Sequence, residues 1–217
     1  MKEELMKKRL VEEAKFPLAL LGVLIVIFIF TGVYAKAGFL SWFLEVLPAF
    51  LGIGVLIVTF RRFPMSKFVY GCVFFHSLIL VYGGYYTYAE TPLGNYVRDL
   101  LELSRNHYDR VGHLALGFFP VFIIKEVLLR KTKLMRDGWF YFIVISVVLA
   151  SAALWELVEW WTTLFVAPEI GAAYLGAQGD IWDAQWDMFL AVVGAAISLF
   201  LLSKRHDASM KKLNLEG

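Results

Sequence analysis

Residues that could do chemistry gather in four short stretches, each beside a long apolar run. The most acidic stretch reads QGDIWDAQWDM and covers residues 178–188. Its aspartates, Asp180, Asp183 and Asp187, are separated by three and then four residues, which is the spacing of one helix face. Three carboxylates and two tryptophans therefore precede an apolar run that is long enough to cross a membrane.

Helical spacing also organises the acidic residues of two other stretches. Asp109 and His113 are four residues apart, and Glu156 and Glu159 are three apart, so each pair shares a helix face. An isolated ionised group in hydrocarbon is costly, and charges within membrane helices usually face the bundle interior. We therefore expect the three helix faces to surround a polar cavity.

The balance of charge around this cavity predicts a cation site. Six carboxylates share the three faces with only two arginines, Arg105 and Arg110, so four negative charges lack an obvious partner. Protonation would resolve this surplus, and so would bound divalent cations, of which the charge would accommodate two. Mixed histidine and carboxylate ligation suits zinc, manganese or iron, while an all-oxygen set suits magnesium or calcium. The expected metal ligands are His113, Glu156, Glu159, Asp180, Asp183 and Asp187.

Other side chains of these stretches suggest catalytic and substrate-binding roles. His107 or Asp109 could transfer a proton, and the two arginines could bind an anionic head group through paired hydrogen bonds. Tyr86 and Tyr88, in the stretch YTYAETPLG, are further candidates for substrate binding. The chain lacks the GxSxG, GxxxxGK and HExxH motifs, so metal-activated water or acid–base chemistry is the available route for an enzyme.

The rest of the sequence describes the scaffold that must position these residues. The chain has 217 residues, of which 59% are hydrophobic and 17% aromatic, with a mean hydropathy of +0.65. Soluble domains contain about 45–50% apolar residues, so this composition predicts an integral membrane protein. The single cysteine, Cys72, excludes an intrachain disulfide and a CxxC site, and the net charge of +2 implies no nucleic-acid partner.

Six apolar runs reach the roughly 20 residues that a transmembrane helix needs, so we predict an all-α, polytopic six-helix bundle. They cover residues 17–35, 39–60, 68–88, 110–129, 139–165 and 185–203. The first run exceeds the roughly 7–15 residues of a signal-peptide core, so we interpret it as a helix. The expected parts are a charged N-terminal segment (1–16), the transmembrane domain (17–203) and a basic tail (204–217). Small residues on one face of the sixth run, including Ala191 and Gly194, predict close helix packing.

The distribution of lysine and arginine predicts the orientation of the bundle. Sixteen of these residues lie in the N-terminal segment, the loops after the second and fourth runs and the tail, and four lie on the other side. The positive-inside rule then places both termini in the cytoplasm and loops 89–109 and 166–184 outside. The cavity would face the periplasm or the cell exterior, where Trp160, Trp161, Trp182 and Trp186 fit an interfacial aromatic belt.

The cytoplasmic half of the bundle carries few polar residues. We assign only His76, Glu45 and Lys125 to it. Lys125 and Glu126 should extend towards the membrane surface, His206 in the tail should be solvated, and His76 should be a hydrogen-bonded packing residue. These residues do not form a polar path that matches the cluster at the outer end.

The four stretches also carry a resemblance to a known family. His76, YTYAETPLG (86–94), LSRNHYDRVGH (103–113), LWELVEWW (154–161) and GAQGDIWDAQWDM (176–188) resemble the YjdF family of bacterial inner-membrane proteins, whose function is unknown. The resemblance runs from about residue 60 to residue 203 and is specific, because the motifs are long. It implies a compact six-helix protein of the inner (cytoplasmic) membrane and supplies no activity.

Three functional hypotheses follow. The first is a membrane-embedded, metal-dependent hydrolase or transferase that acts at the outer leaflet or periplasmic face on a lipid-like substrate, with a divalent metal ion as cofactor. The second is a proton- or cation-coupled transporter, because carboxylates inside a bundle also form proton relays, although no inverted repeat or pair of broken helices is evident. The third is a non-catalytic structural or sensory module, in which salt bridges to the arginines only fix the outer loops.

Overall fold

The computed structural model describes residues 2–213, and within this range the chain is helical and contains no strand. Met1 of the predicted N-terminal segment and residues 214–217 of the predicted tail lie outside the described residues. The helices are α1 (Lys2–Val33), α2 (Phe39–Thr59), α3 (Lys67–Tyr86), the 3-10 helix η1 (Tyr88–Glu90), α4 (Pro92–Leu100), α5 (Tyr108–Phe118), α6 (Val121–Lys131), α7 (Gly138–Thr163), α8 (Pro168–Leu175) and α9 (Asp183–Lys212). The predicted all-α class is confirmed.

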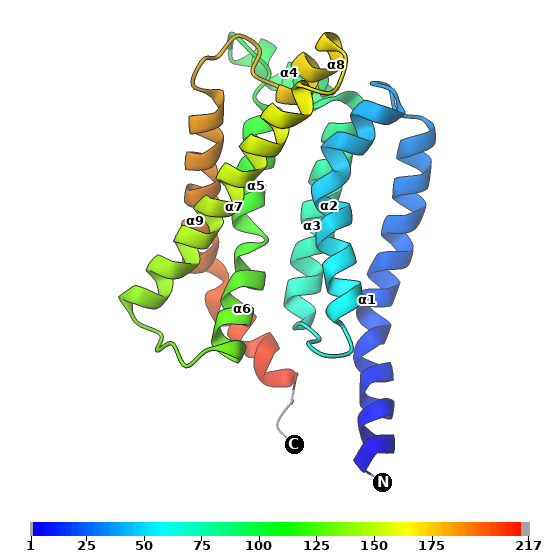
Figure 1. The fold of residues 1–217 in the computed structure, drawn as a ribbon, viewed down its shortest axis with the longest axis vertical. Coiled ribbons are helices and arrows are strands. Elements are labelled where there is room, and N and C mark those ends of the chain that lie inside the picture. Colours follow the sequence, from blue (N-terminus) through cyan, green and yellow to red (C-terminus); the bar gives the residue numbers. More distant parts are fainter. Residues whose placement is uncertain (1, 214–217) are drawn as a thin grey trace.

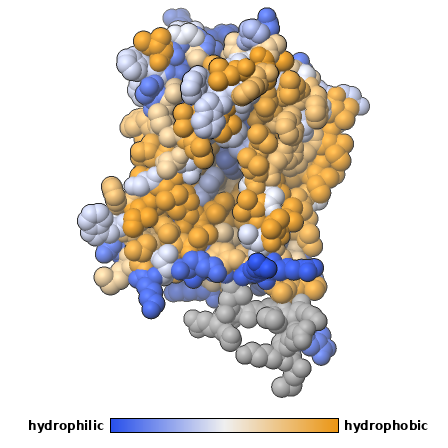
Figure 2. Space-filling model, viewed as in Figure 1, coloured by the Kyte–Doolittle hydropathy of each residue, from blue (hydrophilic) through white to orange (hydrophobic). Residues whose placement is uncertain are grey.

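Six segments are long and apolar enough to cross a membrane, as the sequence predicts. They are Leu10–Val33, Phe39–Thr59, Lys67–Tyr86, Tyr108–Lys131, Gly138–Thr163 and Asp183–Lys212. Figure 1 shows these segments running along the long axis of the molecule, with α4 and α8 together at one end and the start of α1 and the end of α9 at the other. Figure 2 shows a broad apolar band between polar ends, which matches the cross-section of a bilayer.

The fourth span is broken, whereas the sequence predicts one continuous helix over 110–129. α5 ends at Phe118 and α6 begins at Val121, because Pro120 has no backbone N–H to donate and its ring crowds the preceding turn. The ring of Phe119 lies nearly parallel to that of the buried His76, with 6.4 Å between the ring centroids. A buried imidazole therefore lies beside the irregular backbone in the middle of the span.

The close packing predicted for the small-residue face is confirmed between α5 and α9. A Cβ atom added to Gly117 would lie 1.7 Å from the carbonyl oxygen of Ala191, and one added to Gly194 would lie 2.1 Å from that of Leu114. The two backbones can touch only because these positions lack a side chain. This contact brings the start of α5 beside the start of α9, where the acidic residues of both helices lie.

The basic end contains a second polar cluster, and the expectation that His206 is solvated is wrong. His206 is fully buried, with its ring centroid 5.0 Å from that of Phe122 and its Nε2 3.1 Å from Oε2 of Glu126. The reason is that α9 continues as a helix well beyond the predicted end of the span, so its inner face still packs against α6. Lys125 and Glu126 are also buried rather than extended towards the surface, and Lys125 Nζ lies 2.9 Å from Asp207 Oδ1.

We expect Glu126→Gln to lower the free energy of unfolding by about 1–3 kcal/mol. The neutral amide removes the negative charge that pairs with Arg130, and its NH2 group cannot accept a hydrogen bond from the donors that now bond to the carboxylate. Glu126 Oε1 accepts hydrogen bonds from the Ser66 backbone N–H (2.9 Å) and from Arg130 (2.6 Å). Glu12→Gln is the matched control, since Glu12 pairs with Lys15 at the exposed surface, where ion pairs contribute little. Thermal unfolding in detergent measures both, and equal unfolding temperatures would contradict a role for Glu126 in stability.

Candidate functional site

The polar faces of α5, α7 and α9 meet at the end of the bundle that carries α4 and α8, as the helical spacing predicts. His113 lies at the centre: its Nε2 is 3.7 Å from Oδ1 of Asp109, and its Nδ1 is 3.5 Å from Oε1 of Glu156. Two sets of three residues can each bring one ligand atom per residue within 4.8 Å of the others. The sets are Asp109, His113 and Asp187, and His113, Glu156 and Glu159.

Three atoms of this cluster are buried without a hydrogen-bond partner among the described residues. They are Nδ1 of His113, Oε1 of Glu156 and Oδ1 of Asp187. Buried polar atoms in proteins are nearly always satisfied by a partner, a water or an ion. Histidine nitrogens and carboxylate oxygens are also the ligand atoms of zinc, manganese and iron sites. The donor set of this cluster therefore fits a divalent metal ion.

The shared histidine limits how many ions the two sets can hold. A neutral imidazole has one lone pair on one ring nitrogen, and the other nitrogen carries a proton to donate. His113 can therefore coordinate an ion on one side of its ring only. The distances place Asp109 on the Nε2 side and Glu156 on the Nδ1 side, so the geometry favours one ion through His113 rather than the two that the charge count alone would allow.

The two arginines are paired with the two aspartates nearest the loop before α9. Arg105 donates to Oδ1 of Asp183 at 2.5 Å and to the carbonyl oxygens of Gly176 and Ala177, both at 2.9 Å. Arg110 donates to Oδ2 of Asp180 at 2.5 Å. Asp180 and Asp183, both expected among the metal ligands, thus belong to ion pairs and to neither ligand set. The surplus negative charge predicted from the sequence falls on Asp109, Glu156, Glu159 and Asp187.

Glu45 belongs to this site, so its assignment to the cytoplasmic half is wrong. It lies six residues into α2, which starts at the α4 and α8 end, and this position in the span is the signal that could have placed it. Its Oε1 accepts hydrogen bonds from Thr87 (2.5 Å) and Ser41 (3.4 Å), while its buried Oε2 has no partner in the described part of the chain. Thr87 makes its contact with a positive φ of 64°, which is strained for a β-branched residue.

A small cavity joins Glu45 to the cluster. Its volume is about 20 Å³, which is room for about one water molecule. The lining residues are Glu45, Pro48, Leu80, Tyr88, Asp109, Gly112, His113, Leu116, Trp155, Glu159 and Tyr174. The ring of Tyr88, a predicted substrate-binding residue, packs directly against Gly83 and Gly112. A Cβ atom on either glycine would lie 2.7–2.8 Å from this ring, so the position of the ring requires glycine at both sites. Tyr174 lies in α8 and no sequence pattern indicated it; burial raises the pKa of its phenol.

The remaining predicted residues lie around the cluster. His107 precedes α5 and is half-buried; burial, with Arg110 and Arg105 nearby, lowers its pKa and favours the neutral imidazole. Tyr86 does not line the cavity; its ring lies at the end of α3, with Lys36 Nζ 4.8 Å from the ring centroid. The four tryptophans of the predicted belt are all exposed, as interfacial side chains would be. Trp155, which the sequence did not single out, donates to Oε1 of Glu159 at 2.7 Å.

Hydrogen bonds connect three of the four polar stretches identified in the sequence to one another. Gln178 accepts from the backbone N–H of Asn106 at 3.1 Å and donates to the carbonyl oxygen of Asn106 at 2.8 Å. The Asn106 side chain donates to the Thr91 carbonyl oxygen (3.1 Å) and lies so close to Gly94 that a Cβ atom there would clash at 1.9 Å. Sequence reasoning assigned no role to Asn106 or Gln178, because uncharged amides give no charge or spacing signal.

Comparisons with known proteins agree with the resemblance noted in the sequence. Residues 16–208 match the family described as Predicted membrane protein (DUF2238). The chain is 39% identical over 193 residues to "Inner membrane protein YjdF" of Escherichia coli (strain K12), which covers 88% of this chain and 91% of that protein. No solved structure matches the chain. The chain is thus a multi-pass membrane protein that belongs to the DUF2238 family of predicted membrane proteins.

Proposed function

We propose that this protein is a membrane-embedded, metal-dependent hydrolase or transferase that acts on a lipid-like substrate at the outer face of the inner membrane. The observation that carries the proposal is the buried Oδ1 of Asp187, which has no hydrogen-bond partner among the described residues, in a set where Asp109, His113 and Asp187 can bring ligand atoms within 4.8 Å of one another. The name of the Escherichia coli relative and the segregation of lysine and arginine support the membrane and the orientation.

In this proposal Asp109, Asp187 and Nε2 of His113 hold the ion. Nδ1 of His113 then carries the proton and donates it to Glu156, which orients the ring, as carboxylates commonly do for metal-bound histidines. A bound divalent ion supplies Lewis-acid polarisation and a coordinated water of lowered pKa. Glu45 and Glu159 line the cavity and can accept a proton there.

The substrate must reach the cavity from the membrane surface, because about 20 Å³ admits only its reacting group. Arg110 is the arginine suited to an anionic head group: its side chain is 20% exposed and stands 5.3 Å from the Trp186 ring centroid. Arg105 is 6% exposed, and both of its terminal NH2 groups already donate to Asp183 or to loop carbonyls. His107, whose pKa is lowered by burial and by the two neighbouring arginines, would accept a proton near them.

Metal analysis of the purified protein by inductively coupled plasma mass spectrometry tests the proposal. We expect about one equivalent of zinc, manganese or iron in the wild type, and less than a tenth of that in His113→Ala and Asp187→Asn. Asp180→Asn is the matched control, since Asp180 pairs with Arg110 outside the ligand sets, and should keep its metal. Lipid extracts incubated with wild type and His113→Ala would then show metal-dependent turnover. A wild type without metal after supply of all three ions would overturn the proposal.

A proton- or cation-coupled transporter is the second candidate, and the broken fourth span favours it. Irregular backbone at mid-membrane depth commonly lines ion sites in transporters, and the break at Phe119 and Pro120 lies beside the buried His76. The charged cluster at the basic end supplies polar groups on the other side. Uptake driven by a pH gradient into liposomes, abolished by Asp187→Asn, would support this candidate over the enzyme.

A further inference from the structure

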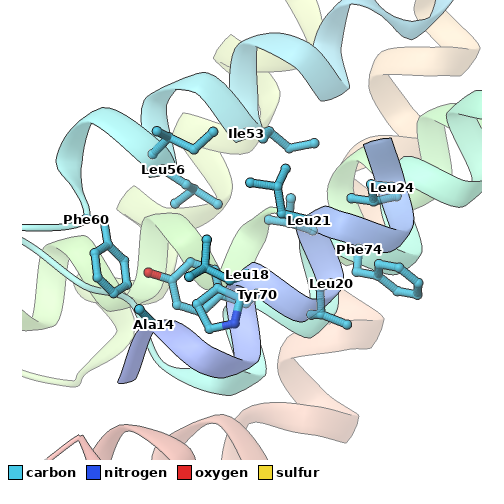
Figure 3. A pocket seen from close by; sticks show the side chains of 13 residues that line it. Ala14, Leu18, Leu20, Leu21, Leu24, Ile53, Leu56, Phe60, Tyr70 and Phe74 are labelled. Carbon is cyan, nitrogen blue, oxygen red and sulfur yellow. The ribbon is translucent and has the colours of Figure 1, made fainter. Parts of the chain in front are cut away.

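An apolar groove lies between α1, α2 and α3, away from the acidic cluster. Figure 3 shows side chains of all three helices converging around it. Its volume is about 220 Å³, and it is lined by Ala14, Pro17, Leu18, Leu20, Leu21, Leu24, Ile53, Leu56, Ile57, Phe60, Tyr70, Val73 and Phe74. These side chains are hydrocarbon apart from the phenol of Tyr70, so the groove matches an alkyl chain.

The groove is reachable from the lipid. Leu18 and Ile57, which line it, are 61% and 56% exposed, and both belong to predicted transmembrane spans that are confirmed as long apolar helices. Whatever fills the groove can therefore enter sideways from the bilayer. A water-soluble ligand has no such route through an apolar band.

The length of the groove matches one leaflet. Its lining on α1 runs from Ala14 to Leu24, and ten residues of α-helix rise about 15 Å. This is half of the roughly 30 Å of hydrocarbon in a bilayer. The remaining lining comes from the end of α2 and the start of α3, so the groove lies in the leaflet on the lysine- and arginine-rich side.

Cationic side chains stand where the head group of such a lipid would lie. Arg61 and Arg62 follow Phe60, the last groove residue of the α2 end, and both are exposed. Two lysines at the same level are already paired, Lys15 with Glu12 at 2.5 Å and Lys67 with Glu13 at 3.8 Å. The two arginines have no acidic partner among the side chains that the structure describes, so their positive charge is available to an anion.

From this complementarity we propose that the groove binds one acyl chain of an anionic phospholipid, whose phosphate is held by Arg61 and Arg62. The site is separate from the acidic cluster and does not depend on the function proposed for it. The lipid fixes α1 against α2 and α3, since it fills the space that their side chains leave open.

Native mass spectrometry of the purified protein, with phosphatidylglycerol and phosphatidylcholine of identical chains supplied in turn, tests the proposal. We expect one retained phosphatidylglycerol per chain and at least fivefold less phosphatidylcholine. The double variant Arg61→Gln, Arg62→Gln should lose this preference, whereas Lys204→Gln with Arg205→Gln, two exposed cations near the end of α9, should keep it.

A tryptophan in the groove tests the acyl-chain site itself. Leu21→Trp should abolish retention, while Val26→Trp, on a lipid-facing position of the same helix, should not. Equal retention of both lipids by the wild type, or retention by a folded Leu21→Trp variant, would overturn the proposal. A wild-type protein that is dimeric and that becomes monomeric in the Leu21→Trp variant would also overturn the proposal. In that case a second copy of the chain would fill the groove. Arg61 and Arg62 lie in a loop outside the helices, so their double variant still tests the proposal if Leu21→Trp fails to fold.

Discussion

Asp187→Asn is expected to raise the unfolding temperature of the metal-free protein and to lower that of the metal-loaded protein. Without an ion, Asp187 and Asp109 have ligand atoms within 4.8 Å of each other and no arginine or lysine partner among the described residues. At this distance and an effective dielectric constant of about 20, two full charges repel by about 3 kcal/mol. Removing one charge should therefore stabilise the metal-free protein by about 1–3 kcal/mol.

The sign reverses when the ion is present. An ion at about 1,000 times its dissociation constant stabilises the folded state by about 4.1 kcal/mol. The variant loses a ligand and most of this gain, which exceeds the stabilisation of about 1–3 kcal/mol that removal of the charge contributes. Thermal unfolding with chelator and with metal, at mildly alkaline pH where more carboxylates are ionised, measures both effects. Asp180→Asn is the control: it breaks the ion pair with Arg110 and should destabilise the protein under both conditions.

This sign change separates the site from a structural acidic cluster. If the carboxylates only fixed the outer loops, every Asp→Asn change would cost stability with or without metal. A destabilised Asp187→Asn variant in chelator would therefore support the structural reading and count against a cation site. The unpartnered oxygen of Asp187 is the observation that makes us expect the opposite result.

The sequence predicts the spans and the polar faces of three helices because both depend on local patterns. Span length follows from bilayer thickness, and a three- or four-residue spacing places Asp109 with His113, and Glu156 with Glu159, on one face whatever the surroundings. That these faces must be buried follows from the cost of charge in hydrocarbon. The convergence of α5, α7 and α9 could thus be expected before the structure was known.

The pairing of charges could not be predicted in the same way. Spacing says which residues share a face of one helix, but the rotation of each helix against its neighbours depends on packing, here on Gly117 and Gly194. Arg105 meets Asp183 across 78 residues of sequence, and two loop carbonyls that carry no sequence signal complete its contacts. In the sequence, Asp180 and Asp183 therefore resemble metal ligands, whereas in the structure they form ion pairs with the two arginines.

The errors at the basic end have a related cause. His206 lies beyond the last apolar residue of its span, where hydropathy gives no reason to expect burial. α9 nevertheless continues to Lys212, and its inner face carries His206 against Phe122 and Glu126. A polar helical extension that packs through one face resembles a solvated tail when only composition is considered.

Arg105→Met should be the most destabilising of the changes at the acidic end, with a loss of about 3–5 kcal/mol in the free energy of unfolding. The side chains of Arg105 and Asp183 are 6% and 9% exposed, so removal of the guanidinium leaves a buried carboxylate without its counter-ion. The carbonyl oxygens of Gly176 and Ala177 lose their donor at the same time. Methionine keeps much of the volume, so the loss reports charge and hydrogen bonding rather than a cavity.

Arg110→Met is the matched control for this prediction. Its pair with Asp180 is more exposed, at 20% and 23% for the two side chains, and water can replace much of the interaction, so we expect a loss of about 1 kcal/mol. Hydrogen exchange should separate the two variants further: Arg105→Met should speed exchange in the loop from Gly176 to Trp182, which Arg105 holds, and Arg110→Met should affect it less. If both variants unfold at the same temperature, Arg105 does not anchor the loop whose Gly176 lies against Asp109.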